Sequence, residues 1–302
     1  DRVLDRKEVK QAYRRVFPEE ERPVVHSGSP PSLKVTSFNI FHGGQEKGLE
    51  VGKNRIIELL KAAHSDVYAI VETYGSGEEI ADALGYELYL ISSNLSIISR
   101  YPITQTFQIF RPFNSGGAEI MLPDNEKVRV FGIWLTYLPQ YKEALFAEQN
   151  RDIDAFLQED KKTRGVQMQK ILEEIAPMLV MADSIPVILA GDFNSGSHLD
   201  WTEAFAGQHN GYSIPFTASI LLQNAGLIDS YRKVNTMREA PGFTSPFWQT
   251  KVNLLKDKID FIYFKGEKLQ VIHSRVFDNY TKGFPSDHAG VSTLFNRNVG
   301  KN

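Results

Sequence analysis

Single polar residues adjoin the apolar runs of this sequence, where a rigid scaffold usually presents functional side chains. Asn39, Glu72 and Asp192 each come at the end of such a run, and Asp287 and His288 stand just before the last one. Carboxylate and amide oxygens, without any Cys, suit a hard cation, Mg²⁺ before Zn²⁺. We therefore expect oxygens of Asn39, Glu72 and Asp287 to form a partial shell that water and a phosphate would complete.

The pair Asp192 and Asn194 indicates a second kind of chemistry. Residues two apart in an extended segment point to the same face, so one side chain could take a proton from water while the other donates to a phosphoryl oxygen. His288 needs a second carboxylate to hold its tautomer, and Asp260, inside an apolar run, is the buried candidate. Taken singly, each of these residues could equally make a turn or a cap.

The segments that must position these residues alternate between strand and helix patterns. Apolar spacing at three to four predicts helices at 50–63, 142–157 and 164–181, and an amphipathic helix at 7–17. Residues 207–219 are small and polar, which predicts a loop. The expected strands are 33–40, 66–71, 86–91, 95–99, 104–110, 118–122, 128–135, 186–190, 259–264, 269–276 and 289–295. Several strands are apolar on both faces and are flanked by helices, and some strands are joined by short connections. These features favour a mixed α/β sandwich.

Composition narrows the class of protein without naming it. The chain has 302 residues, no Cys and a net charge of −3, so it has no disulfide framework and no overall attraction to nucleic acid or anionic lipid. We expect one domain over 33–298, preceded by an arm at 1–32. No apolar run approaches the ~18 residues of a membrane helix, so no membrane span is expected. The absence of Cys and of an initiator Met is compatible with a secreted or periplasmic protein, and localisation and oligomeric state stay open.

Six short motifs occur in an order that resembles the endonuclease/exonuclease/phosphatase superfamily, which has a deoxyribonuclease-I-like fold. The resemblance covers about 33–295 and implies a four-layer α/β/β/α sandwich that hydrolyses phosphate esters with one or two divalent ions. The motifs are Phe38-Asn39-Ile40, His42-Gly43-Gly44, Val71-Glu72-Thr73, Gly191-Asp192-Phe193-Asn194, Ile259-Asp260-Phe261 and Ser286-Asp287-His288.

The resemblance also implies a role for each residue of these motifs. Glu72 would be the main metal carboxylate, with Asn39 and Asp287 as further ligands of Mg²⁺, Mn²⁺ or Ca²⁺. Asp192 would orient or deprotonate the attacking water. Asn194 would hold a phosphate oxygen. His288 would stabilise the phosphoryl group, and Asp260 would keep the His288 imidazole in place.

Some positions depart from the superfamily pattern or add to it. Many members carry a His where this chain has Tyr137, in a Tyr-x-Pro stretch similar to the exonuclease-III-like and abasic-site branch. Tyr137 could serve the leaving group, or simply pack at a strand end. Against the DNA branch, Phe41 stands where an acidic residue is expected, and Tyr74 where a Lys would meet DNA. Further substrate-binding candidates, each with a turn, cap or packing role as the alternative, are His42, Asn94, His198 and Trp201.

The sequence therefore predicts a metal-dependent phosphoesterase acting on a small-molecule or lipid-like phosphate mono- or diester. One alternative is a Mg²⁺-dependent nuclease acting on DNA or RNA, although the Arg and Lys residues form no run of the kind that nucleic-acid readers use. A second alternative is a binding module that keeps the fold without the chemistry.

Overall fold

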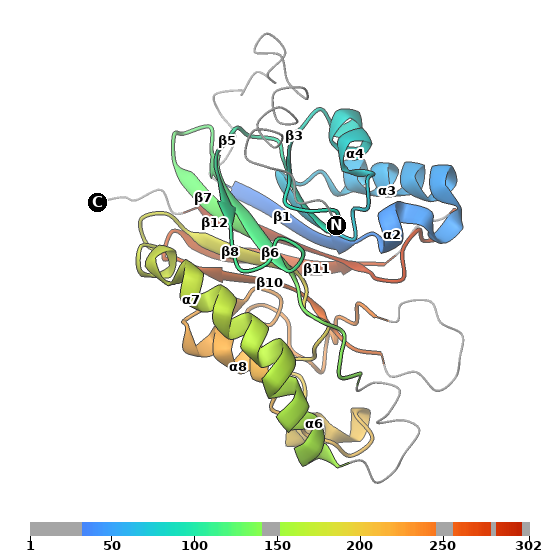
Figure 1. The fold of residues 1–302 in the computed structure, drawn as a ribbon, viewed down its shortest axis with the longest axis vertical. Helices are drawn as coiled ribbons and strands as arrows, with labels where there is room; N and C mark the ends of the chain where they lie inside the picture. The colour runs from blue at the N-terminus through green and yellow to red at the C-terminus, as the bar shows by residue number, and fades with distance from the viewer. Residues whose placement is uncertain (1–31, 141–151, 246–255, 279–281, 298–302) are drawn as a thin grey trace.

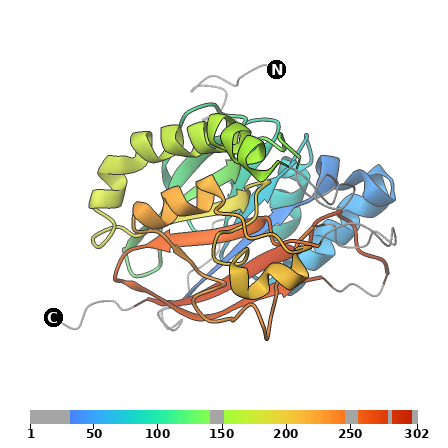
Figure 2. The same cartoon turned by 90° about the horizontal axis from the view of Figure 1, so that it is seen from below.

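The computed structural model describes residues 32–140, 152–245, 256–278 and 282–297. In this part of the chain two six-stranded sheets lie face to face, with helices on their outer sides (Figure 1). The view from below shows the same layering (Figure 2). The predicted four-layer α/β sandwich is confirmed.

The first sheet carries the N-terminal half of the site. Its middle strands β1 and β2 run parallel, and Asn39 pairs with Val71, so the carboxyl ends of both strands reach the same edge. In spatial order its strands are β11 (Leu269–Phe277), β12 (Gly290–Arg297), β1 (Ser32–Asn39), β2 (Val67–Val71), β4 (Leu95–Ser99) and β3 (Glu87–Leu90).

The second sheet carries the remaining half. β7 and β8 are parallel, whereas β8 and β10 are antiparallel with Asp192 opposite Asp260. β7 and β8 lie so close that a Cβ on Gly191 would stand 1.9 Å from the Ile133 carbonyl oxygen, which explains the glycine. The strands are, in order, β5 (Ile103–Gln108), β6 (Ser115–Met121), β7 (Lys127–Trp134), β8 (Val187–Asp192), β10 (Asp260–Lys265) and β9 (Ile228–Asp229).

Helices cover both outer faces. On the first sheet they are α2 (Phe41–Gly44), the 3₁₀ turn η2 (Gln45–Lys47), α3 (Leu49–Ala63) and α4 (Gly77–Leu84). Against the second sheet and beyond its end lie α6 (Ile153–Asp160), the π-helical turn η3 (Lys161–Gly165), α7 (Val166–Val180), η4 (Glu203–Gln208) and α8 (Thr217–Asn224). No helix of the described ranges has the length and apolar character needed to cross a membrane.

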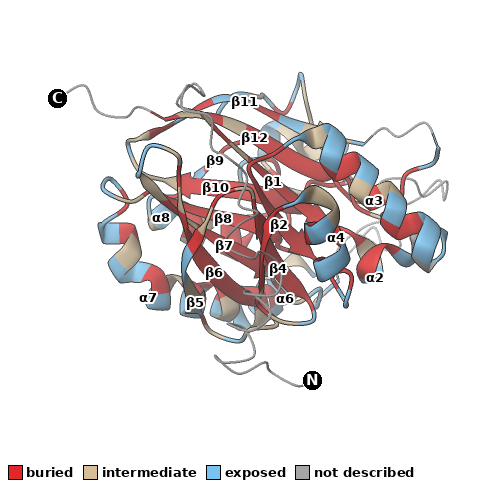
Figure 3. Ribbon diagram, turned by 90° about the horizontal axis from the view of Figure 1, so that it is seen from above, coloured by how far each residue is buried: buried red, intermediate tan, exposed pale blue. Residues whose placement is uncertain are grey.

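The core fills the spaces between these layers, as the burial colouring shows (Figure 3). Ile97 and Ile188 belong to the cluster between the sheets, Phe131 packs under α7, and Ile70 packs under α3. Each such fully buried side chain contributes about 1.5–3 kcal/mol relative to exposure. The sheets are therefore rigid supports for the residues at their ends.

Two sequence-based expectations about helices need correction. The predicted loop at 207–219 ends in helix α8, and α4 was not predicted. The helix predicted at 142–157 lies partly outside the described residues; its described part begins α6 at Ile153. The predicted helix at 7–17 and the arm at 1–32, apart from Ser32, also lie outside them.

Candidate active site

The first half of the candidate site forms where β1 and β2 end side by side. Asn39 is fully buried, and its Nδ2 donates to Glu72 Oε1 at 3.1 Å. The backbone N–H of His42 donates to Glu72 Oε2 at 2.9 Å, and the N–H of Gly43 donates to the Glu72 carbonyl at 2.7 Å. Glu72 holds a left-handed backbone with φ of 59°. The loop after β1 therefore fixes both the backbone and the carboxylate of Glu72.

The second sheet meets the first through Asp192. Asn39 Nδ2 also donates to Asp192 Oδ2 at 3.1 Å, so one amide links a carboxylate of each sheet. Asp260 lies opposite Asp192 on the neighbouring strand, and both are buried. Thr244 Oγ1 accepts from the backbone N–H of Asp260 at 3.2 Å. Three carboxylates from distant parts of the chain thus converge at one end of the sandwich.

His288 completes this group from the loop just before β12. A hydrogen bond of 2.8 Å joins its Nδ1 to Asp260 Oδ2, and its Nε2 lies 4.0 Å from Asp192 Oδ2. Ser286 Oγ accepts from the His288 N–H at 3.1 Å and donates to the Asn39 carbonyl at 2.5 Å. Because Asp260 occupies Nδ1, the proton on Nε2 is free to act toward the side of Asp192.

The charges of this group perturb one another. Burial raises the pKa of Asp192 to about 7, opposed by the positive charge of His288 and reinforced by Asp260. Burial by itself would lower the pKa of His288, but Asp260 and Asp192 raise it to about 10. His288 is therefore an imidazolium at neutral pH, and it stabilises the negative charges around it.

The carboxylates beside this group fit a divalent cation. Burial raises the pKa of Asp287, and the negative charge of Glu72 adds to the effect. Oδ1 of Asp287 is buried and, among the described residues, has no hydrogen-bond partner. A cation would relieve this repulsion and satisfy the orphaned oxygen, so Glu72 and Asp287 could hold one. Asn39 as an oxygen ligand stays a prediction, because its Oδ1 accepts from the Phe41 N–H at 3.0 Å.

A different group of side chains in the described ranges also has the spacing of metal ligands. Oxygen and nitrogen atoms of Asp192, Asp260 and His288 lie within 4.8 Å of one another. We interpret this trio as a hydrogen-bonded relay, since Asp260 Oδ2 and His288 Nδ1 already bond each other.

Asn194 orients Asp192 in this structure. Its backbone N–H donates to Asp192 Oδ1 at 2.8 Å, and its Nδ2 donates to Asp192 Oδ2 at 3.2 Å and to the Leu135 carbonyl at 2.9 Å. Contact between this amide and a phosphate stays a prediction. Tyr137 follows β7 in the adjacent loop, and the residue is 51% exposed.

Two of the substrate-binding candidates lie beside Glu72. The His42 ring is exposed, with its Nε2 3.6 Å from Glu72 Oε2, and it stacks on Phe41 and meets the edge of Tyr74. Asn94 is fully buried; its carbonyl accepts from the Thr73 N–H, just after Glu72. Asn94 Nδ2 donates to the Phe113 carbonyl, whereas its Oδ1 has no partner among the described residues.

The other two candidates do not join the site. Trp201 is 1% exposed, donates from Nε1 to Asp257 and stacks on His209, so it has the packing role that was its alternative and not the expected place at the substrate. Both ring nitrogens of His198 bond α8, to Ser219 Oγ and Gln223 Oε1, which corrects its expected place at the site.

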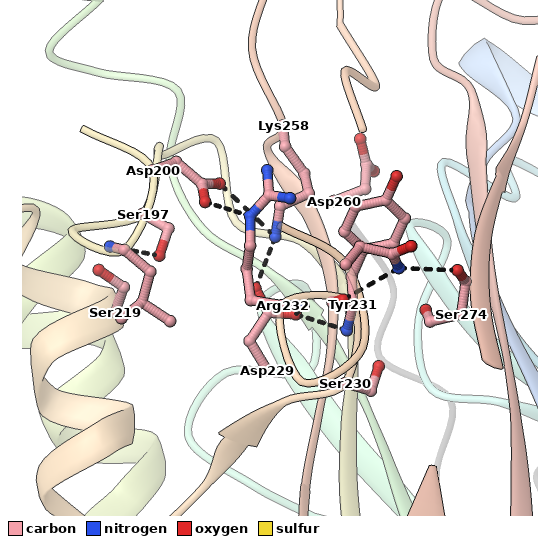
Figure 4. Close-up of polar contacts among 12 residues, drawn as sticks. Ser197, Asp200, Ser219, Asp229, Ser230, Tyr231, Arg232, Lys258, Asp260 and Ser274 are labelled. Carbon is pink, nitrogen blue, oxygen red and sulfur yellow. Dashed lines mark hydrogen bonds and ion pairs between the residues drawn. The ribbon is translucent and has the colours of Figure 1, made fainter. Parts of the chain in front are cut away.

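A buried ionic network supports the start of β10 (Figure 4). The Lys258 ammonium lies 2.5 Å from Asp229 and 3.7 Å from Asp200, and Arg232 also pairs with Asp200. All four side chains are at most 8% exposed, so each charge depends on its partner. The network anchors the strand two residues before Asp260.

Sequence reasoning did not single out three supporting residues: Thr244, Ser286 and Arg164. Ser286 stands inside the Ser-Asp-His motif, so its place next to His288 was available as a signal. Thr244 bonds the backbone N–H of Asp260, and Arg164 bonds the backbone carbonyl of Asn194. Both partners are distant in the sequence, and nothing near Thr244 or Arg164 in the sequence indicates these bonds.

Fold and site together define a deoxyribonuclease-I-like α/β sandwich with a carboxylate-rich end. A profile of the Endonuclease/Exonuclease/phosphatase family matches residues 36–288. The chain therefore belongs to this family.

Similar proteins and solved structures agree with that assignment. Uncharacterized protein F14F9.5 of Caenorhabditis elegans is 24% identical over 86% of this chain and 90% of its own length. Truncated C. elegans TDP2 superposes with a TM-score of 0.60 at 16% identity, over 87% of this chain and 97% of that one. The structure of D. rerio TDP2 complexed with single strand DNA product superposes with a TM-score of 0.59 at 17% identity, over 88% of this chain and 99% of that one. The endonuclease/exonuclease/phosphatase of Beutenbergia cavernae superposes with a TM-score of 0.59 at 16% identity, over 88% of this chain and 72% of that one. At these identities the structural likeness shows the fold.

Proposed function

We propose that this chain is a divalent-metal-dependent phosphoric ester hydrolase, with Mg²⁺ as its ion, acting on a small-molecule or lipid-like phosphate mono- or diester. The observation that carries the proposal is the chain of contacts from Asp260 through His288 to Asp192, beside Glu72 and Asp287. Such an arrangement supplies a base, a cationic donor and a metal-binding edge within one buried group, which is what displacement at phosphorus requires.

Each residue then has a defined task in the reaction. Asp192 accepts the proton of a water whose oxygen attacks phosphorus in line with the leaving oxygen. The imidazolium of His288 donates from Nε2 to a phosphoryl oxygen, and Asp260 keeps its Nδ1 proton in place. Glu72 and Asp287 would hold the metal, which supplies Lewis acidity and charge neutralisation at the phosphate. The leaving oxygen takes a proton from the Tyr137 phenol or from solvent.

The rim beside Glu72 supports a substrate with an apolar or planar part. Phe41, His42 and Tyr74 form a cluster of rings with centroids 4.6 and 5.5 Å apart, and none of them brings a fixed positive charge. A rim built for a nucleic-acid backbone would instead present Lys and Arg.

A nuclease is the second candidate, and one observation favours it. The crystal structure of D. rerio TDP2, which shares this fold, is a complex with single strand DNA product. The two candidates differ in salt dependence. Binding to a phosphate backbone weakens steeply as salt rises, because counterions are released, whereas a small ester involves few such contacts.

The test is hydrolysis of a panel of esters with Mg²⁺, Mn²⁺ and Ca²⁺. The panel contains p-nitrophenyl phosphate, bis-p-nitrophenyl phosphate, sphingomyelin vesicles, a phosphosugar and single- and double-stranded oligonucleotides. We expect turnover of a non-nucleic ester, and Asp192→Asn should lower kcat by about 10³-fold or more because it removes the base.

Asp154→Asn, which removes an exposed carboxylate from α6, is the matched control and should keep the wild-type rate. Salt-sensitive cleavage of oligonucleotides alone would favour the nuclease. A chain whose ligand binding is the same with and without Asp192 and that turns over nothing would be a binding module.

A further inference from the structure

Arg164 is a fully buried cation beside the candidate site that the proposed chemistry leaves unused. It lies in the π-helical turn η3 between α6 and α7, and its side chain is 0% exposed. Nε donates to Asp160 Oδ1 at 2.6 Å, and Asp160 Oδ2 accepts from the backbone N–H of Thr217 at 3.2 Å, at the start of α8. π-helical turns inside helices occur often at functional sites.

The rest of the guanidinium reaches two loops that leave the second sheet. Nη1 donates to the Asn194 carbonyl at 3.0 Å, after β8, and Nη2 donates to the Pro139 carbonyl at 3.1 Å, after β7. Longer contacts of 3.5 and 3.4 Å reach the carbonyls of Thr136 and Tyr137. One cation thus joins the loop that carries Tyr137 to the loop that carries Asn194.

A guanidinium suits this place for a physical reason. It offers five N–H donors in a rigid fork, so it can serve a carboxylate and several carbonyls at once, whereas an ammonium cannot match that geometry. Burying a charge is costly unless every donor is satisfied. A buried Arg that donates most of its hydrogen bonds to the carbonyls of two loops therefore fixes the separation of those loops.

Asn194 is the point where this clamp meets the catalytic group. Its backbone is left-handed, with φ of 47°, a conformation that Asn adopts more readily than other residues with side chains, and bonds to its N–H and to its carbonyl hold it there. In that conformation its N–H bonds Asp192 Oδ1 at 2.8 Å. The Arg164 bond to the Asn194 carbonyl thus acts one peptide away from the group that aims Asp192.

We propose that Arg164 is a positioning residue for the ester hydrolysis: it clamps the loops after β7 and β8, holds Asn194 in its left-handed conformation and so keeps Asp192 aimed at the attacking water. This inference rests on the proposed function. It assigns Arg164 no contact with substrate or metal.

A double-mutant cycle tests the proposal, with Mg²⁺ and bis-p-nitrophenyl phosphate as the probes. Arg164→Lys keeps the charge and loses the fork, so it should lower kcat about 10- to 100-fold with KM changed less than threefold, because aim is lost and binding is kept. In an Asp192→Asn background the same substitution should cost less than threefold, since the carboxylate that the clamp aims is already removed. Equal losses in both backgrounds would overturn the proposal.

The control separates positioning from general stability. Arg297 is another buried arginine, bonded at 2.8 Å to both oxygens of Asp124, at the far end of β12 from His288. Arg297→Lys should lower the melting temperature without lowering kcat below half of the wild-type value. A kcat loss that follows the melting temperature equally in both Arg variants would also overturn the proposal.

A second readout does not depend on turnover. Amide hydrogen exchange at Asn194 should speed up at least tenfold in Arg164→Lys relative to Arg297→Lys, because its N–H loses its fixed carboxylate partner. Unchanged exchange would contradict the clamp. Wild-type protein that hydrolyses no ester would refute the proposed function, while this exchange measurement would still decide the geometry.

Discussion

At the scale of single residues, the site depends on an imidazolium held between two carboxylates. Asp260 bonds Nδ1 of His288, and Asp192 lies on the side of Nε2. Because the positive charge is shared, neither carboxylate is an isolated buried anion, and the group is stable in a place where a lone charge would not be. In the proposed reaction, the same sharing prepares the histidine to donate to a phosphoryl oxygen.

Asp260→Asn tests this arrangement. An amide carries no charge, so the His288 imidazolium loses the carboxylate that bonds its Nδ1 proton and the electrostatic support that this carboxylate gives. We expect kcat to fall about 10²- to 10⁴-fold in steady-state kinetics, in the range found when the acid of a catalytic triad is replaced by its amide. A loss smaller than threefold would show that Asp260 does not support the imidazole.

Tyr137 calls for a test that depends on the leaving group. Tyr137→Phe should slow the hydrolysis of alkyl phosphate esters by about 10²-fold, because their leaving oxygen needs a proton. Rates for p-nitrophenyl esters should change little, since nitrophenolate leaves unprotonated. Equal slowing of both substrates would instead point to a packing role for the ring.

At the scale of elements, strand ends carry the functional groups and strand pairing sets their spacing. β1 and β2 are parallel and bring Asn39 and Glu72 together, whereas antiparallel β8 and β10 place Asp192 opposite Asp260. The hairpin of β6 and β7 stiffens the second sheet, with Glu119 buried opposite Arg129.

Glu119 gives the hairpin a pH dependence. Burial alone would raise its pKa, but bonds from Lys127 and Arg129 outweigh burial and lower the pKa below 4.5. Its contribution to stability is therefore present above pH 4.5 and is lost as pH falls through the lowered value. Glu119→Gln should cost about 2 kcal/mol in urea unfolding at pH 7, with a smaller cost at pH 3. An equal cost at both pH values would contradict this account.

Many elements could be predicted from the sequence because their patterns are strong. The apolar run before Asp192 and the spacing in 50–63 each match an element of the structure. Helix α8 could not be predicted in the same way, since it has eight residues and no side-chain cap. Arg164 stands at the start of the helix predicted at 164–181, and its complete burial follows from tertiary packing that the sequence does not show.

The candidate site was predictable to a similar degree. Motif order indicated which residues would meet, since most of the motifs lie at or next to the end of a strand. Backbone bonds are not visible in a sequence, so neither the Asn194 N–H on Asp192 nor the Asn39 amide between two carboxylates could be foreseen. Trp201 was assigned to substrate binding because the sequence does not distinguish an exposed Trp after a motif from a buried one.

At the scale of the whole molecule, the site exists only because two sheets meet. Asn39, Glu72 and Asp287 belong to the first sheet and its loops, while Asp192 and Asp260 belong to the second. A net charge of −3 gives the molecule no general attraction to polyanions, so in the proposed function the affinity for a phosphate would come from local groups and a cation. The proposed function therefore requires that the two sheets together build a metal-dependent hydrolytic site.

The most direct test of that claim is the rate of bis-p-nitrophenyl phosphate hydrolysis as a function of Mg²⁺ concentration, for wild type and Glu72→Gln. We expect no rate after EDTA treatment, a saturable return with Mg²⁺, and at least a tenfold higher Mg²⁺ requirement or a rate lost altogether in the variant. Hydrolysis that continues without any divalent ion, or a variant with the wild-type Mg²⁺ dependence, would contradict the account.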